Sequence, residues 1–221
     1  MNLIVSKHDL IVFDLDDTIY KEIDFLYSAF REIASVVRPS NTNASFEFMK
    51  HLYTERKDVF EGIIKAFAPK LTKNDLLKIY RNHWPDINLS PGVVDVLNAL
   101  KIYDVPMSLL TNGRSLTQRN KIRSLGIDGY FQDIIISEEF GSEKPCKRNY
   151  QYFENKYTDK KKTYIGDNFS KDFSVPNMFG WNTIGLIDDG RNIHKQVFTL
   201  GCKSLPKVTI KSFADIRIQY V

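Results

Sequence analysis

The sequence predicts an α/β protein in which a parallel sheet lies between two layers of helices and is interrupted once by an all-helical insertion. Two observations lead to this class. From residue 91 onward, short apolar runs alternate with helical segments, whereas residues 19–89 show helical periodicity without a comparable strand. The chain has 221 residues, of which 43% are hydrophobic, so it can form one main domain with a modest insertion.

Five short apolar runs are the predicted strands. The first, Leu10–Phe13, stops at Asp14 and is apolar throughout, which is typical of a strand buried on both faces. Similar runs follow at 105–110, 133–136, 163–165 and 183–187. Strands separated by helices form right-handed parallel units, so we expect all five runs in one sheet.

Helix signals separate the later strands. Ser90 and Pro91 predict an N-cap followed by proline at the first helical position, with the helix continuing to Ile102. A second helix over 116–125 is expected to end at Gly126, because glycine readily adopts the left-handed conformation that ends helices.

The insertion contains apolar residues at helical spacing over 25–37, 46–52 and 60–67, and Thr72–Asp75 has the form of a capping box. We therefore expect a core domain formed by 1–18 and 90–221, and a helical cap formed by 19–89. An insertion that follows a candidate catalytic loop is well placed to act as a lid.

Composition excludes several classes of protein. The 31 Lys+Arg and 27 Asp+Glu leave a net charge of +4, which is too small and too scattered for a dedicated nucleic-acid binder but suits a small anionic substrate. Cys146 and Cys202 form no C-x-x-C pair, which argues against a disulfide scaffold or a cysteine zinc site and for a reducing cytoplasm. No run of about 18 apolar residues predicts a membrane span.

Carboxylates follow two of the predicted strands. Asp14, Asp16 and Asp17 come after the first strand, and Asp167 and Asp172 come after the fourth. The carboxyl ends of parallel strands meet at one edge of the sheet, where open α/β sheets bind ligands. Carboxylates about 4 Å apart repel each other by on the order of 4 kcal/mol at an effective dielectric constant of 20, so the cluster needs a counter-ion, a proton or a nearby cation. Oxygen donors without histidine or thiolate favour Mg²⁺.

Two further segments complete a candidate site. Lys144 precedes Pro145, which favours an extended backbone from which the ammonium could face the carboxylates. Thr111, Asn112 and Gly113 end the second strand with a hydroxyl, an amide and a backbone N–H as potential phosphate donors. Each motif alone fits an ordinary turn, but their order and strand-end placement indicate a functional site.

The motifs FDLDDT, LLTNG, EKP and GDNFSKD occur in this order along nearly the whole chain. They resemble the haloacid dehalogenase superfamily of hydrolases, specifically its phosphatase-like subfamily IA with a helical C1-type cap and a three-layer, Rossmann-like core. The stretch TNGRSLTQRNKIRSLGIDGYF further resembles the subgroup of pyrimidine nucleotidases and acylneuraminate phosphatases, although that likeness lies in core helices rather than in substrate contacts.

The resemblance implies a role for each candidate residue. Asp14 would attack phosphorus, and Asp16 would protonate the leaving oxygen and then deprotonate water. The implied Mg²⁺ ligands are the Asp14 carboxylate, the Asp16 backbone carbonyl and Asp167. Asp172 would lie behind these ligands and act either through water or by orienting Lys144.

Thr111, Asn112 and Lys144 are expected to bind the transferring phosphoryl group. We therefore expect Mg²⁺-dependent hydrolysis of a small phosphorylated metabolite, such as a nucleotide or sugar phosphate, by a monomer or homodimer with no nucleic-acid or membrane partner. A phosphomutase and a non-catalytic binding module are the alternatives. Dehalogenation is disfavoured, because departure of a halide needs neither a proton from Asp16 nor a divalent ion bound by Asp167. The substrate contacts stay open among Tyr20, Lys21, Arg56, Lys57 and Arg114.

Overall fold

The computed structural model describes residues 1–68, 70–199, 201 and 204–221, so Cys202 lies outside the described residues. Its central sheet has the strand order β4-β3-β2-β5-β6-β7, and every neighbouring pair is parallel. The strands are β2 (Asp9–Phe13), β3 (Met107–Thr111), β4 (Asp133–Ile136), β5 (Lys161–Gly166), β6 (Asn182–Leu186) and β7 (Val208–Ile210). The five predicted strands are thus all present in one sheet, with β2 between β3 and β5.

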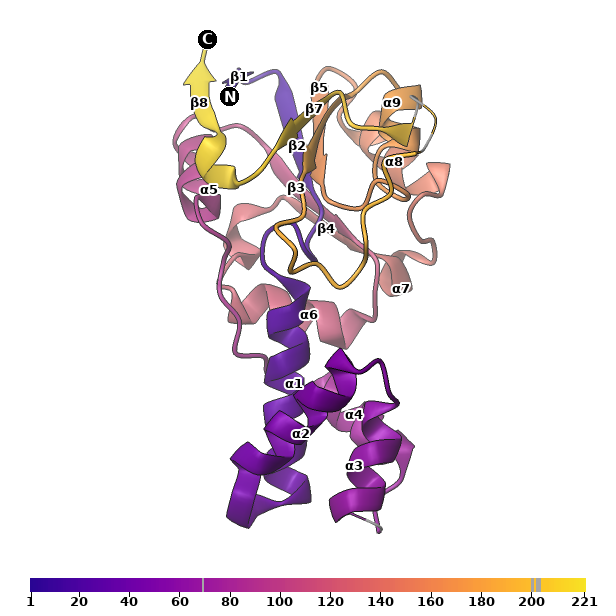
Figure 1. Ribbon diagram of the computed structural model, residues 1–221. Coiled ribbons are helices and arrows are strands. Elements are labelled where there is room, and N and C mark those ends of the chain that lie inside the picture. Colours follow the sequence, from indigo (N-terminus) through magenta and orange to yellow (C-terminus); the bar gives the residue numbers. More distant parts are fainter. Residues whose placement is uncertain (69, 200, 202–203) are drawn as a thin grey trace.

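Helices cover both faces of the sheet, which confirms the three-layer α/β fold (Figure 1). Ile11 and Phe13 of β2 pack on one side with α5 (Val93–Ile102) and α6 (Ser115–Ser124). Leu10 and Val12 pack on the other side with α8 (Lys147–Lys156) and near α9 (Ser174–Met178). Successive side chains of a strand point to opposite faces, so β2 is apolar throughout because both faces are buried.

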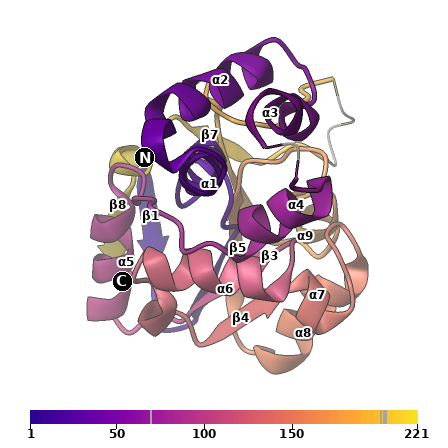
Figure 2. The same cartoon turned by 90° about the horizontal axis from the view of Figure 1, so that it is seen from below.

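Four helices of the insertion form a separate layer below the sheet (Figures 1 and 2). They are α1 (Glu22–Val37), α2 (Thr42–Thr54), α3 (Val59–Phe67) and α4 (Lys73–Asn82), and their apolar faces meet in a hydrophobic cluster of their own. The capping box is present at Thr72 and Asp75. The chain enters this layer at Tyr20 and returns at Leu89, and these two residues form an isolated antiparallel bridge.

The expected start of α5 is wrong. The helix begins at Val93, and its N-cap is Gly92 with φ +83°, not Ser90. Gly92 packs so closely on the backbone of Ala214 that an added Cβ would lie 2.2 Å from the Ala214 nitrogen. Only glycine combines this conformation with so close an approach, and a contact between segments so distant in sequence has no local signature. The end of α6 at Gly126 is as predicted, with φ +67°.

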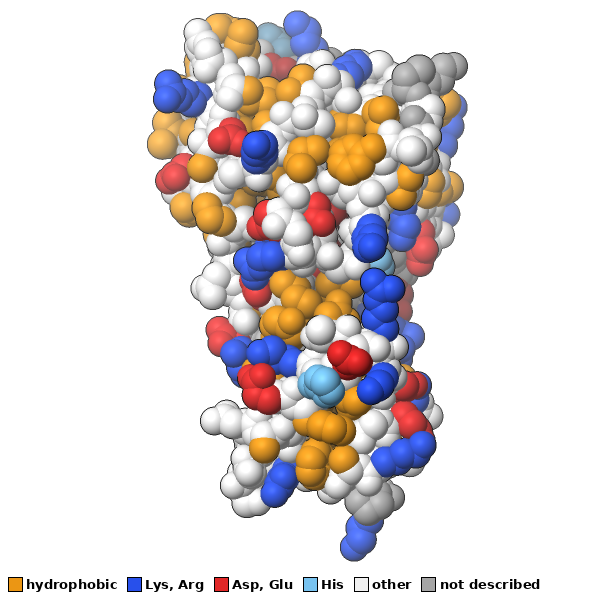
Figure 3. Space-filling view, in the orientation of Figure 1, with side chains coloured by type: hydrophobic (Ala, Val, Ile, Leu, Met, Phe, Trp, Pro, Cys, Tyr) orange, Lys and Arg blue, Asp and Glu red, His pale blue; other side chains and the backbone are white. Residues whose placement is uncertain are grey.

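The sequence analysis missed three strands. Besides β7, β1 (Asn2–Val5) pairs in parallel with β8 (Arg217–Tyr220) as a separate two-stranded sheet. Short helices among the described residues include α7 (Ser137–Phe140) and the 3₁₀ turns 39–41, 128–130 and 213–215. On the face shown in Figure 3, basic and acidic side chains are interspersed. Among the described residues, no helix combines the length and the apolar character needed to cross a bilayer.

Candidate active site

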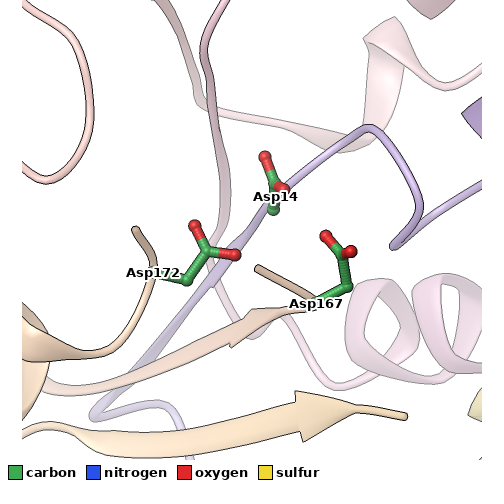
Figure 4. A group of neighbouring side chains, drawn as sticks. All are labelled: Asp14, Asp167 and Asp172. Atoms are coloured by element: carbon green, nitrogen blue, oxygen red, sulfur yellow. The ribbon is translucent and has the colours of Figure 1, made fainter. Parts of the chain in front are cut away.

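Three buried aspartates meet at the carboxyl ends of the central strands (Figure 4). Asp14 follows β2, whereas Asp167 and Asp172 follow β5. Each offers a carboxylate oxygen that lies within 4.8 Å of the corresponding oxygens of the other two. They line a cavity of about 290 Å³, so the two acidic segments predicted to converge do so at one site.

The ammonium of Lys144 lies among these carboxylates, as its place before Pro145 predicts. Its Nζ donates to Asp14 Oδ1 at 2.6 Å, to Asp172 Oδ1 at 2.8 Å and to the Tyr164 hydroxyl at 3.0 Å. Burial opposes a charged lysine, but attraction by Asp14 and Asp172 outweighs it and raises the pKa of Lys144 above its usual range. Lys144 is therefore a fixed cation directly beside Asp14.

Even with this lysine, the site carries excess negative charge. Burial raises the pKa of Asp14 to about 7; Lys144 opposes the shift and repulsion by Asp172 adds to it. Burial and repulsion by Asp14, Asp172 and Asp17 raise the pKa of Asp167 to about 9. Neighbouring carboxyl groups hold protons this strongly when the positive charge around them does not balance their negative charge. The donor set, composed of oxygens without histidine or thiolate, fits a hard divalent cation.

These pKa shifts predict how metal-free protein responds to pH. The unfolded state releases its carboxyl protons above about pH 4, whereas the folded state keeps those of Asp14 and Asp167 until about pH 7 and pH 9. The folded state therefore loses stability as the pH rises through these two values. We expect the melting temperature in EDTA to fall by about 5 °C or more between pH 5 and pH 9, and Mg²⁺ to restore most of this loss. Thermal scans measure both effects. Asp167→Asn should flatten the metal-free slope above pH 7, and an unchanged slope would contradict the assignment.

Asp172 is fully buried, more so than the other two aspartates of the cluster. Its Oδ1 accepts from Lys144 Nζ and, at 3.1 Å, from the Tyr164 hydroxyl, while its Oδ2 accepts from the Asn168 backbone N–H at 2.9 Å. Because both oxygens already have protein donors, the geometry suits a residue that orients Lys144.

The segment after β3 borders the same cavity, but its donors are arranged differently from the prediction. The Asn112 side chain binds the Lys144 backbone, accepting from its N–H at 2.8 Å and donating to its carbonyl at 3.3 Å. The Gly113 N–H, expected to be free for phosphate, donates to Ser137 Oγ at 3.0 Å. Asn112 therefore joins the end of β3, where Thr111 lies, to the loop that carries Lys144.

Asp16 lines the cavity, but its carboxylate is absent from the cluster of three. Lys121 Nζ lies 2.7 Å from Asp16 Oδ1, and Gln118 Nε2 lies 2.8 Å from Asp16 Oδ2. The Tyr20 hydroxyl also donates to Oδ1. Burial raises the pKa of Asp16, but the charge and hydrogen bond of Lys121 outweigh it and keep that pKa below its ordinary value.

The sequence analysis missed Gln118 and Lys121 as site residues. The signal was their spacing of three, which places two polar side chains on one face of α6. It also missed Asn192, whose Nδ2 donates to Asp167 Oδ2 at 2.8 Å from a loop without a recognisable motif. Thr18 Oγ1 donates to the other Asp167 oxygen at 3.4 Å.

Asp17 is the third carboxylate that follows β2. It is buried, and its carboxylate accepts from the backbone N–H groups of Glu22 at 2.9 Å and Ile193 at 3.2 Å. Asp17 therefore fixes the backbone of its own loop and of the loop that carries Ile193. The described residues that line the cavity include none of the five candidates for substrate contact: Tyr20, Lys21, Arg56, Lys57 and Arg114. They do include Glu22, Lys171 and His194.

Comparisons with known proteins agree with this architecture. A glyceraldehyde 3-phosphate phosphatase of Methanocaldococcus jannaschii is 27% identical over 191 residues, which cover 80% of this chain and 84% of that protein. The pyrimidine 5'-nucleotidase YjjG of Escherichia coli is 37% identical over 62 residues, or 28% of this chain and 27% of that protein. The crystal structure of YfnB from Bacillus subtilis bound to magnesium has a TM-score of 0.66 at 20% identity, covering 94% of this chain and 96% of that one.

The family model for haloacid dehalogenase-like hydrolases matches residues 11–185. This range contains the carboxyl ends of β2 and β5, all three clustered aspartates, Lys144 and the helical insertion. The chain therefore belongs to the haloacid dehalogenase-like hydrolases.

Proposed function

We propose that this protein is a Mg²⁺-dependent phosphomonoesterase that acts on a small phosphorylated metabolite through an aspartyl-phosphate. One observation carries the proposal: Lys144 Nζ bridges Asp14 and Asp172, and Asp167 lies within reach of the same space. A carboxylate beside a fixed ammonium and further carboxylates is equipped to attack an anionic ester once a divalent cation offsets the repulsion.

In this mechanism Asp14 bonds to phosphorus while the bond from phosphorus to the leaving oxygen breaks. Asp16 is ionised in the free protein and takes up a proton when the negative charge of the bound ester raises its pKa. It gives this proton to the leaving oxygen and later accepts one from the water that hydrolyses the aspartyl-phosphate. Thr111, Asn112 and Lys144 bind the phosphoryl oxygens. Asp14, Asp167 and the Asp16 backbone carbonyl would hold Mg²⁺, which when bound offsets the charge of the phosphoryl group.

The substrate is a small phosphate ester, such as a sugar phosphate or a nucleotide. The cavity of about 290 Å³ favours small molecules, and two relatives are a glyceraldehyde 3-phosphate phosphatase and a pyrimidine 5'-nucleotidase. Residues 19–89 act as the cap over a core formed by 1–18 and 90–221. Closure of the cap would exclude bulk water and large phosphoproteins.

A panel of sugar phosphates and nucleoside monophosphates tests this function. We expect release of inorganic phosphate with Mg²⁺, loss of activity in EDTA and recovery when Mg²⁺ is restored. Relative kcat/KM values across the panel would identify the substrate class. A phosphomutase would instead form an isomer and depend on a bisphosphate primer. Phosphate release that is unaffected by EDTA would contradict the proposal.

A further inference from the structure

Lys121 is a buried lysine to which the proposed mechanism gives no role. It lies on α6 and is 3% exposed. Its ammonium pairs with Asp16 at 2.7 Å and lies 4.3 Å from the centroid of the Phe25 ring, a position suited to a cation–π contact. Among the described residues, only Lys144 and Lys162 are also buried lysines. Desolvating an ammonium is costly, so burial beside Asp16 calls for an explanation.

Three donors occupy both oxygens of the Asp16 carboxylate. Lys121 and Tyr20 donate to Oδ1, and Gln118 donates to Oδ2. Gln118 Nε2 also donates to Thr111 Oγ1 at 2.7 Å. A carboxylate held by donors on both oxygens has one fixed orientation. Through Gln118, that orientation is coupled to the threonine proposed to bind the phosphoryl group.

This network spans the junction between the sheet and the helical insertion. Lys121 and Gln118 belong to α6, whereas Phe25 lies in the second turn of α1. The Tyr20 backbone forms isolated β-bridges with Asp16 and with Leu89. The chain enters the insertion at Tyr20 and leaves it at Leu89. Two of the side chains that hold Asp16 therefore lie at this junction, because Lys121 contacts Phe25 and Tyr20 pairs with Leu89.

We propose that Lys121 and Gln118 are positioning residues. Together they form a clamp that holds the Asp16 carboxylate in one orientation for proton transfer. This inference rests on the proposed function. The clamp matters most for hydrolysis of the aspartyl-phosphate, because Asp16 must then accept a proton from a water molecule at one defined position. Loss of the clamp allows the aspartyl-phosphate to form from an ester with a good leaving group but slows its hydrolysis.

Lys121→Met tests the clamp because it removes the ammonium while keeping an apolar stem against Phe25. With 4-nitrophenyl phosphate and Mg²⁺, we expect steady-state kcat to fall by about 10²-fold and KM to fall with it, so that kcat/KM changes little, and a burst of one nitrophenolate per active site to appear. Intact-protein mass spectrometry should show the phosphorylated enzyme accumulating. Lys121→Arg should restore most of the turnover and suppress the burst.

Lys162→Met is the matched control, since it removes a buried lysine whose ammonium lies 3.2 Å from Glu154 Oε1 and forms no pair with Asp16. A Lys121→Met protein that loses turnover without a burst or added phosphate, as a merely destabilised enzyme would, overturns the clamp. If Lys121→Met does not fold, Gln118→Leu carries the same test, because it removes the bond to Asp16 Oδ2.

Asp16→Asn distinguishes a failure of the clamp from a failure of the proposed phosphatase function. Accumulated phosphoenzyme in Asp16→Asn, together with none in Lys121→Met and Gln118→Leu, would overturn the clamp and leave the phosphatase function standing. Wild-type turnover by Asp16→Asn would overturn the role of Asp16 itself and the clamp with it.

Discussion

Asp14→Asn is expected to abolish phosphate release, with kcat falling by on the order of 10⁶-fold, as is typical when an enzyme loses its nucleophile. Asparagine has nearly the same size as aspartate, so the cavity keeps its shape. Its amide, however, does not attack phosphorus and does not complete the cluster with Asp167 and Asp172. Phosphate release assayed with Mg²⁺ at saturating substrate measures the effect.

Asp128→Asn is the control for this substitution, because Asp128 is an exposed aspartate in the 3₁₀ turn before β4. It should leave kcat unchanged. Phosphate release by Asp14→Asn at more than a small fraction of the wild-type rate, after excluding contaminating wild-type enzyme, would show that another group is the nucleophile.

Lys144→Met should have the largest effect on stability as well as a severe effect on activity. The Lys144 side chain is 4% exposed, and the substitution leaves Asp14 and Asp172 facing each other in a buried site without their shared cation. Removing one partner of a buried ion pair costs about 3–5 kcal/mol. We expect the melting temperature to fall by about 10 °C, measured in EDTA so that Mg²⁺ does not compensate.

Two comparisons identify the cause of that loss. Lys65→Met removes an exposed lysine that pairs with Glu61 at 3.2 Å, and it should change stability by less than about 1 kcal/mol. Adding Asp172→Asn to Lys144→Met should recover part of the lost stability, since it removes one of the uncompensated charges. A double variant less stable than Lys144→Met would point to lost packing rather than to electrostatics.

Local patterns were sufficient to predict most of the fold. The strand β2 is apolar at every position because both of its faces are buried, and the capping box at Thr72 is a purely local device. The start of α5 was predicted wrongly, because the close approach of Gly92 to Ala214 joins segments far apart in sequence. The short strands β1 and β8 depend on each other in the same way.

The candidate site follows a similar division. Asp14, Asp167 and Lys144 could be predicted because each is next to a strand end or a proline, and topology brings strand ends together. The partners of Asp16 could not be predicted. Lys121 and Gln118 are ordinary polar residues of a helix until the fold turns that face toward the sheet edge.

The site of phosphorylation tests the central claim most directly. Asp16→Asn protein is mixed with 4-nitrophenyl phosphate, whose leaving group needs no proton from Asp16, and with Mg²⁺, then quenched in acid, digested and mapped by mass spectrometry. The proposed mechanism predicts one phosphate on the peptide that contains Asp14, and none when Asp14→Asn is added. Phosphate on any other residue, or an unmodified Asp14 peptide while the wild-type enzyme turns over the same ester, would contradict it.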